Sequence, residues 1–128
     1  MDECKIKIAS CGGGLNTEIR TVGEMCEADG TVIFRYKLEG DDCTLTVKDG
    51  TVSQIRSGRQ SVCMVFSEGT ITEGNTGDGY LICPLEVYTR KISFKCGKGG
   101  FRLTLLYTVN DENIRLDFTA LKTNLEIK

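Results

Sequence analysis

Arg56 is the residue whose position most suggests specific chemistry. Asp49 and Gly50 predict a two-residue turn between two strands, and this turn places Arg56 opposite Cys43 on an apolar face. A guanidinium there could anchor a carboxylate or phosphate of a ligand, because its planar fork matches both groups. It could instead close one end of a barrel in an ion pair with a carboxylate such as Glu39, and we favour this structural interpretation.

Two tyrosines add to this candidate site. Tyr36 and Tyr107 lie among apolar residues of their predicted strands, where each hydroxyl could line a cavity or each ring could belong to the core. The candidate ligand-binding residues are therefore Arg56, Tyr36, Glu39 and Tyr107.

The chain lacks the groups that most enzymes use for proton transfer. It contains no His, so the usual general base and half of most nucleophile pairs are missing. The carboxylates that could replace His lie at predicted turns or strand ends, where solvated charge is the ordinary explanation. They are Glu24, Glu27, Asp29, Asp41 and Asp42. We therefore expect no enzymatic activity and no catalytic residue.

The seven cysteines lack the spacing of a metal site. No CxxC pair occurs and His is absent, which leaves a clip between Cys4 and Cys11 as a weak metal alternative. The odd number, together with a start that resembles no signal peptide, predicts reduced and buried thiols, as for Cys43 and Cys63. We expect a cytoplasmic protein without cofactor or bound metal.

A second candidate surface is basic. Residues 87–110 contain five cations and no acid, namely Arg90, Lys91, Lys95, Lys98 and Arg102. With Tyr88, Phe94 and Phe101 between them, they are similar to barrel strands that bind single-stranded nucleic acid by phosphate contacts and stacking. If Phe94 and Phe101 are core residues, the basic face is instead solvated or contacts an acidic face in self-association.

The elements that position these residues are predicted to be strands. Apolar and polar side chains alternate along almost the whole chain, and the fifteen glycines with a single proline suit tight turns between strands. Segment 67–79 lacks the pattern and is predicted to be a mobile loop. The apolar phase shifts to Leu121, Leu125 and Ile127, which predicts a bulge or bend near residue 120, and Gly23 predicts another.

These strands fit one β-barrel. The 128 residues suffice for a single domain over 1–128, and 40% hydrophobic with 27% charged residues exclude a disordered chain. A net charge of −2 favours neither nucleic acid nor a membrane surface, and no apolar run is long enough for a membrane helix. About eight to ten antiparallel strands predict an up-and-down barrel, because closure removes exposed edges.

The order of several motifs resembles the YwiB-like family of small bacterial proteins. The motifs are FRYKLE at 34–39, TLTVKDGTV at 44–52, IRSG at 55–58, MVF at 64–66 and FRLTLLY at 101–107. The chain departs from the family at 84–86, where members carry a glycine. The resemblance implies an all-β, calycin-like (lipocalin-like) barrel of unestablished activity. We expect a module that binds a small ligand or protein partner and that could form homo-oligomers. The alternative is binding of nucleic acid or another polyanion through residues 88–102.

Overall fold

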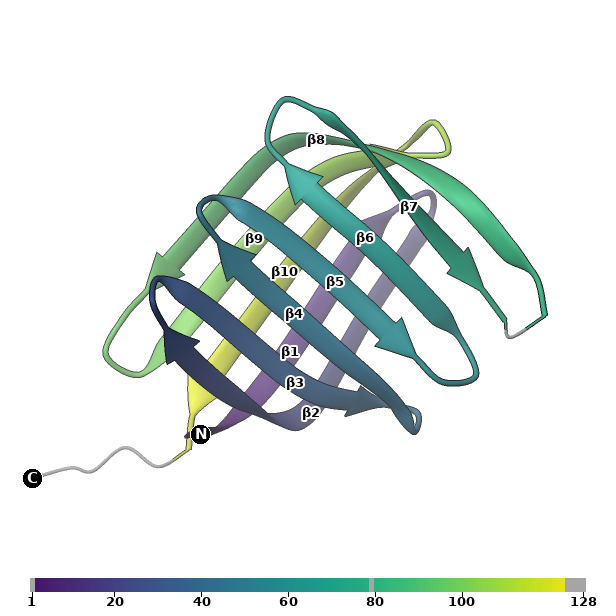
Figure 1. The fold of residues 1–128 in the computed structure, drawn as a ribbon. Coiled ribbons are helices and arrows are strands. Elements are labelled where there is room, and N and C mark those ends of the chain that lie inside the picture. Colours follow the sequence, from purple (N-terminus) through teal and green to yellow (C-terminus); the bar gives the residue numbers. More distant parts are fainter. Residues whose placement is uncertain (1, 79, 124–128) are drawn as a thin grey trace, which may run out of the picture.

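Consecutive antiparallel strands close into a barrel (Figure 1). This computed structural model describes residues 2–78 and 80–123, and these form ten strands. They are β1 (Asp2–Gly12), β2 (Leu15–Ala28), β3 (Thr31–Leu38), β4 (Asp41–Lys48), β5 (Thr51–Ser57), β6 (Ser61–Ser67), β7 (Ile71–Gly77), β8 (Ile82–Cys96), β9 (Gly100–Val109) and β10 (Glu112–Lys122). Each strand pairs with its neighbour in sequence, and β10 pairs with β1. The predicted all-β, up-and-down barrel is confirmed.

Two-residue turns set the register of the hairpins. Asp49 and Gly50 both have positive φ, as the turn between β4 and β5 requires, and the pairing of Cys43 with Arg56 follows from it. The register predicted from the sequence for this hairpin is therefore confirmed. It places Arg56 on the inner face of β5.

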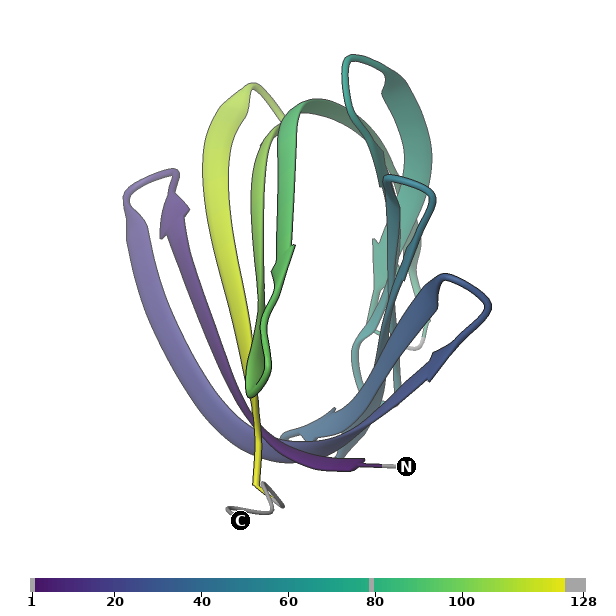
Figure 2. The ribbon, with the colours of Figure 1, turned by 90° about the vertical axis from the view of Figure 1, so that its left-hand side faces the viewer.

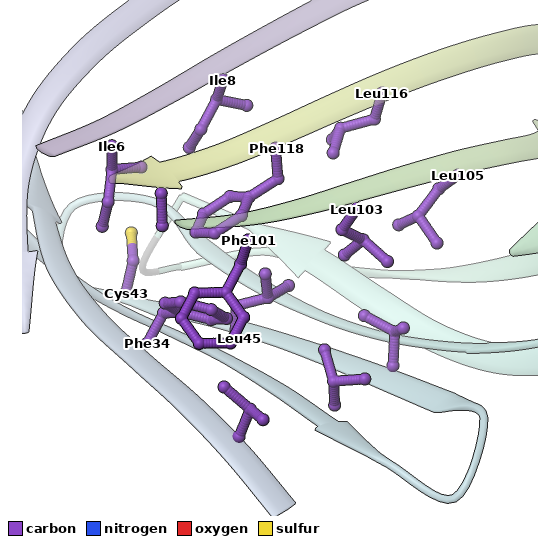
Figure 3. Close-up of a cluster of buried hydrophobic side chains, with 14 of the residues drawn as sticks. Ile6, Ile8, Phe34, Cys43, Leu45, Phe101, Leu103, Leu105, Leu116 and Phe118 are labelled. Atoms are coloured by element: carbon purple, nitrogen blue, oxygen red, sulfur yellow. The ribbon is translucent and has the colours of Figure 1, made fainter. Parts of the chain in front are cut away.

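The inner face is filled by large apolar side chains. Phe34, Phe66 and Phe118 are fully buried, and the Phe34 and Phe118 ring centroids are 4.9 Å apart. Figure 3 shows side chains from opposite walls, such as Leu45 and Leu105, pointing into the same interior. Strands that curve round a common interior, as Figure 2 shows, thus enclose a packed core.

The segment predicted to be a mobile loop, 67–79, contains strand β7, so that prediction is wrong. The sequence ITEGNTG hides the strand because its inward positions are Thr72, Gly74 and Thr76 rather than apolar residues. β7 is held by its ladder with β8, whereas it pairs with β6 only over residues 61–63. A Cβ on Gly74 would collide with the Cys63 carbonyl, so glycine permits the close approach of β7 to β6.

Strand β8 runs without interruption from Ile82 to Cys96 and contains one irregularity. A register shift between Thr89 and Lys91 moves the inward phase by one residue, so that Thr89 and Ile92 both face the core side. Residues 82–86 pair with β7 alone, and the β7–β8 hairpin projects beyond β9 in Figure 1.

Neither of the two other predicted irregularities contains a bulge. The ladder between β1 and β10 runs without a shift through Ala120 and Leu121, and Gly23 pairs regularly with both Cys4 and Tyr36. Leu121 simply points outward. The apolar phase predicted at Leu125 and Ile127 lies outside the described residues.

Candidate functional site

Arg56 is engaged inside the barrel wall by a buried carboxylate. Its Nε donates to Asp41 Oδ2 at 2.8 Å, and the backbone N–H groups of Arg59 and Gln60 donate to the same carboxylate at 2.8 and 3.2 Å. Gly58 lies directly against this carboxylate, because a Cβ there would collide with it. We refer to Asp41, Arg56 and the backbone of residues 58–60 as the carboxylate clasp.

The clasp keeps Asp41 ionised. The hydrogen bond from the Arg59 N–H, with those from Arg56 and Gln60, lowers the pKa of Asp41 below its ordinary value, although burial opposes this. Each carboxylate oxygen is occupied and Asp41 is only 3% exposed, so this acid is unavailable as a general base for a substrate.

Glu39 is the secondary partner of Arg56. Its Oε2 is 3.8 Å from Arg56 Nη2, and its side chain is 87% exposed, against 17% for Arg56. The prediction that Asp41 is a solvated carboxylate is wrong. The missed signal is that Asp41 shares the inward phase of β4 with Cys43 and Leu45.

The two candidate tyrosines are core residues on different walls. Tyr36 lies on β3, in the same inward row as Cys43 and Arg56, and its ring is 5.9 Å from that of Phe118. Tyr107 lies on β9, with its ring 4.9 Å from Phe66. Burial raises the pKa of both tyrosines, so both hydroxyls stay protonated.

These placements bring only part of the predicted ligand site together. Tyr36, Arg56 and Glu39 lie near one end of the barrel, whereas Tyr107 packs from the other wall, and the space between is occupied by apolar side chains. Arg56 has its strongest partner within the chain. The geometry therefore supports the closing role for Arg56 better than the ligand anchor.

The basic residues lie on the outside of β8 and β9. Lys95 and Arg102 are directly paired across the ladder and both are exposed, as are Arg90, Lys91 and Lys98. The aromatic rings named with them point inward: Phe94 and Phe101 stack at 6.0 Å and pack in the core. The structure thus removes two of the three rings of the expected stacking surface.

A more pronounced surface feature was missed in the sequence. The β7–β8 hairpin and the turn between β9 and β10 border an open groove of about 400 Å³. Its walls include Ile71, Pro84, Glu86, Tyr88, Asn110 and Asp111. Beyond the groove, the hairpin tip presents Tyr80 at 98% and Ile82 at 75% exposure. We refer to this surface as the hairpin groove; its signal in the sequence was the apolar run YLICPL at 80–85.

The cysteines are more exposed than predicted. Cys4 and Cys43 are buried and Cys63 is partly buried, but Cys11, Cys83 and Cys96 are exposed. Cys4 and Cys11 cannot form a metal clip, because they are separated by an odd number of residues in β1 and point to opposite faces. Within residues 2–78 and 80–123, no group of His, Cys, Asp and Glu could hold a metal ion.

Thr89 is a buried polar residue that the sequence analysis also missed. Its backbone bonds to the segment after β6, since the Gly69 N–H donates to the Thr89 carbonyl and the Thr89 N–H donates to that of Thr70. The Thr89 hydroxyl, in contrast, is buried and has no hydrogen-bond partner among the described residues. Just after the bulge, the Ile92 N–H donates to Glu68 Oε1 at 2.9 Å.

Comparisons with known proteins identify relatives of this fold. A family model described as "Domain of unknown function (DUF1934)" matches residues 4–123. The crystal structure of the ywiB protein from Bacillus subtilis is similar with a TM-score of 0.87 and 18% identity, over 96% of this chain and 93% of that one. No curated protein matches the chain. The part of the chain that the structure describes contains no helix of the length and apolarity needed to cross a membrane.

Proposed function

This chain belongs to the DUF1934 family, a domain family of unknown function. We propose that it is a non-enzymatic, cytoplasmic β-barrel. In this proposal, the hairpin groove binds a cationic, amphipathic segment of a partner protein. The observation that carries this proposal is a surface on which exposed apolar side chains alternate with acids that form no ion pair among the described residues. A packed interior directs the search for function to the outer surface.

The apolar part of the hairpin groove is larger than single exposed side chains would explain. Ile71 is 65% exposed and pairs across the ladder with Tyr88, which is 42% exposed. The exposed residues Leu81 and Ile82 follow at the hairpin tip. The Glu73–Glu86 pair lies between these two apolar groups on the same face of the ladder. Exposed apolar side chains gathered on one surface with charged neighbours are typical of surfaces that bind other proteins.

The acids of this surface have no cationic partner among the described residues. Glu73 and Glu86 are paired directly across the ladder, where like charges repel, and Asp111 lies on the other side of the groove. None of these three acids forms an ion pair within the described part of the chain. A lysine or arginine from a partner would relieve the repulsion and could stack on Tyr88.

The same features argue against two other occupants. A two-fold dimer through the hairpin groove would bring two copies of Glu73, Glu86 and Asp111 into one interface, with no cation from the groove to balance them. Addition of a strand to the free edge of β8 is hindered by Pro84, which lacks an N–H at the centre of that edge. A cationic segment that binds through its side chains would avoid the repulsion between acids and would not need the N–H that Pro84 lacks.

The test uses two labelled synthetic peptides with the same alternating leucine and valine positions, one with lysine between them and one with glutamate. Fluorescence anisotropy should show saturable binding of the lysine peptide alone. Tyr88→Ser should weaken it about tenfold or more, since buried aromatic contacts dominate such interfaces, and Glu86→Lys about threefold or more. Ile55→Ser and Glu24→Lys, which alter an exposed apolar residue and an exposed acid on other walls, are the matched controls.

Three results would contradict the proposal. Equal binding of both peptides would mean that charge does not select the partner. Equal losses in the control variants would place the binding outside the hairpin groove. If neither peptide binds and light scattering shows self-association that Tyr88→Ser abolishes, the occupant is a second copy of the chain.

A further inference from the structure

A row of cations crosses the outer wall on the far side of the β8 bulge from the hairpin groove. The ladders pair Lys95 with Arg102, Arg102 with Thr119, Thr119 with Lys7, and Lys7 with Arg20. These five residues thus follow one another from β8 through β9, β10 and β1 to β2. At about 4.8 Å between neighbouring strands, the row extends over roughly 19 Å. We refer to it as the cationic row.

The cationic row is positive after its internal ion pairs are counted. Lys7 and Arg20 share one carboxylate, Glu18, at 3.6 and 3.0 Å. Lys95 and Arg102 form no ion pair within residues 2–78 and 80–123, although they are directly opposite each other. Two facing cations on one ladder are destabilising, and a bound anion would remove this repulsion.

The composition of the row indicates what kind of anion fits. It contains four cations and one threonine, and the exposed apolar residues Leu121 and Val22 lie in the adjacent row rather than between the cations. Phe94 and Phe101, which alternate with these cations in the sequence, point into the core and leave no stacking surface for bases beside Lys95 and Arg102. Lysine, arginine and threonine side chains are the usual partners of phosphate oxygens.

We propose that the cationic row binds the phosphate backbone of an extended single-stranded nucleic acid without reading its bases. The length of the row exceeds the size of a single phosphate group. Its four cations are spaced one or two strands apart. This inference is independent of the hairpin groove, because the row contains none of the groove residues.

The test is a salt titration of the affinity for a labelled short oligothymidylate. With four phosphate contacts, log K should fall with log[salt] with a slope of about −3. The double variant Lys95→Gln/Arg102→Gln should reduce the steepness of this slope by about 1.4, since two contacts are lost. It should unfold at an unchanged or slightly higher urea concentration, because a repulsive pair has been removed.

The matched control is Arg35→Gln/Lys48→Gln, which removes the same charge from exposed positions on β3 and β4. It should keep the slope of the unmodified protein. Equal losses in both double variants would overturn the proposal, because global charge would then explain the binding. No binding at low salt would also overturn it, as would tighter binding of polyglutamate, which would identify an acidic polypeptide as the ligand. A strong preference among oligonucleotides of different sequence would contradict backbone recognition.

Discussion

Replacing Thr89 with valine should stabilise the protein. The Thr89 side chain is 0% exposed, and its hydroxyl lacks a hydrogen-bond partner among the described residues. Burying a hydroxyl without a partner costs about 1–3 kcal/mol, and valine keeps nearly the same shape without this cost. We therefore expect the free energy of unfolding to rise by about 1 kcal/mol or more.

The expected change in melting temperature follows from the size of the chain. An unfolding entropy of about 2.1 cal/mol/K per residue gives roughly 0.27 kcal/mol/K for 128 residues. A gain of about 1 kcal/mol then corresponds to an increase of about 4 °C in Tm. Circular dichroism in urea and on heating measures both quantities.

Thr104→Val is the matched control for this substitution. The Thr104 hydroxyl donates to Asp117 Oδ1 at 2.8 Å, so the same change removes a hydrogen bond to a carboxylate and should cost about 1.5–3 kcal/mol. Opposite signs at the two positions would support the reasoning. If Thr89→Val is neutral or destabilising while Thr104→Val behaves as expected, the Thr89 hydroxyl has a partner, such as a buried water, and the reasoning is refuted.

Three further predictions concern the carboxylate clasp, a glycine contact and the thiols. The pKa of Asp41 in the folded protein is lowered, so its ionised form contributes its full stabilisation at pH values above the ordinary pKa of 3.8. This stabilisation is lost as the pH falls through the lowered pKa. Urea titrations at several pH values should therefore show that the stability advantage of the unmodified protein over Asp41→Asn shrinks in this acidic range. Gly58→Ala should lower the urea midpoint of unfolding, because the added Cβ would collide with the Asp41 carboxylate and the residue has a positive φ. Gly97→Ala is the control and should change the midpoint little, because the nearest atom to its added Cβ is 4.0 Å away. Equal effects of the two substitutions would contradict the contact between Gly58 and Asp41. Iodoacetamide should modify the exposed Cys11 quickly in the native protein. It should modify Cys43 only upon unfolding, because this thiol is buried and burial raises its pKa. Peptide mapping by mass spectrometry measures both rates, and equal rates would refute the burial of Cys43.

The parts of the fold that were predictable are those in which local pattern and turn chemistry agree. Alternation at Val32, Phe34 and Tyr36 predicted a strand with a buried face, and Asp49 and Gly50 fixed the register that turns Arg56 inward. Strand β7 was not predictable in this way. Its inward residues are threonine and glycine, and it is positioned by backbone pairing with β8 rather than by apolar burial.

The candidate sites show the same division. Strand phase correctly placed Arg56 inside and the lysines of β8 outside. The alternation in β4 also indicates that Asp41 points inward, together with Cys43 and Leu45. Its position next to the Glu39–Gly40 turn, however, favoured the interpretation as a solvated acid. The hairpin groove and the cationic row depend on ladders between strands distant in sequence, such as β1 with β10, and no local pattern reports those pairings.

The closure of β1 against β10 makes this barrel topologically close to a ring. Nine of its ten strand pairings join sequence neighbours, and the tenth brings Cys4 beside Lys122, with the Thr123 N–H donating to the Glu3 carbonyl. Loop-closure entropy therefore concentrates in one step, and folding should be limited by this final zipping of the two ends. If the two ends were linked covalently and the chain were opened in the turn at 97–99, β1 and β10 would become sequence neighbours. The ladder between β8 and β9 would then join the two ends of the chain. Such a circular permutant should keep all ten strand ladders while its slow step moves to the pairing of β8 with β9.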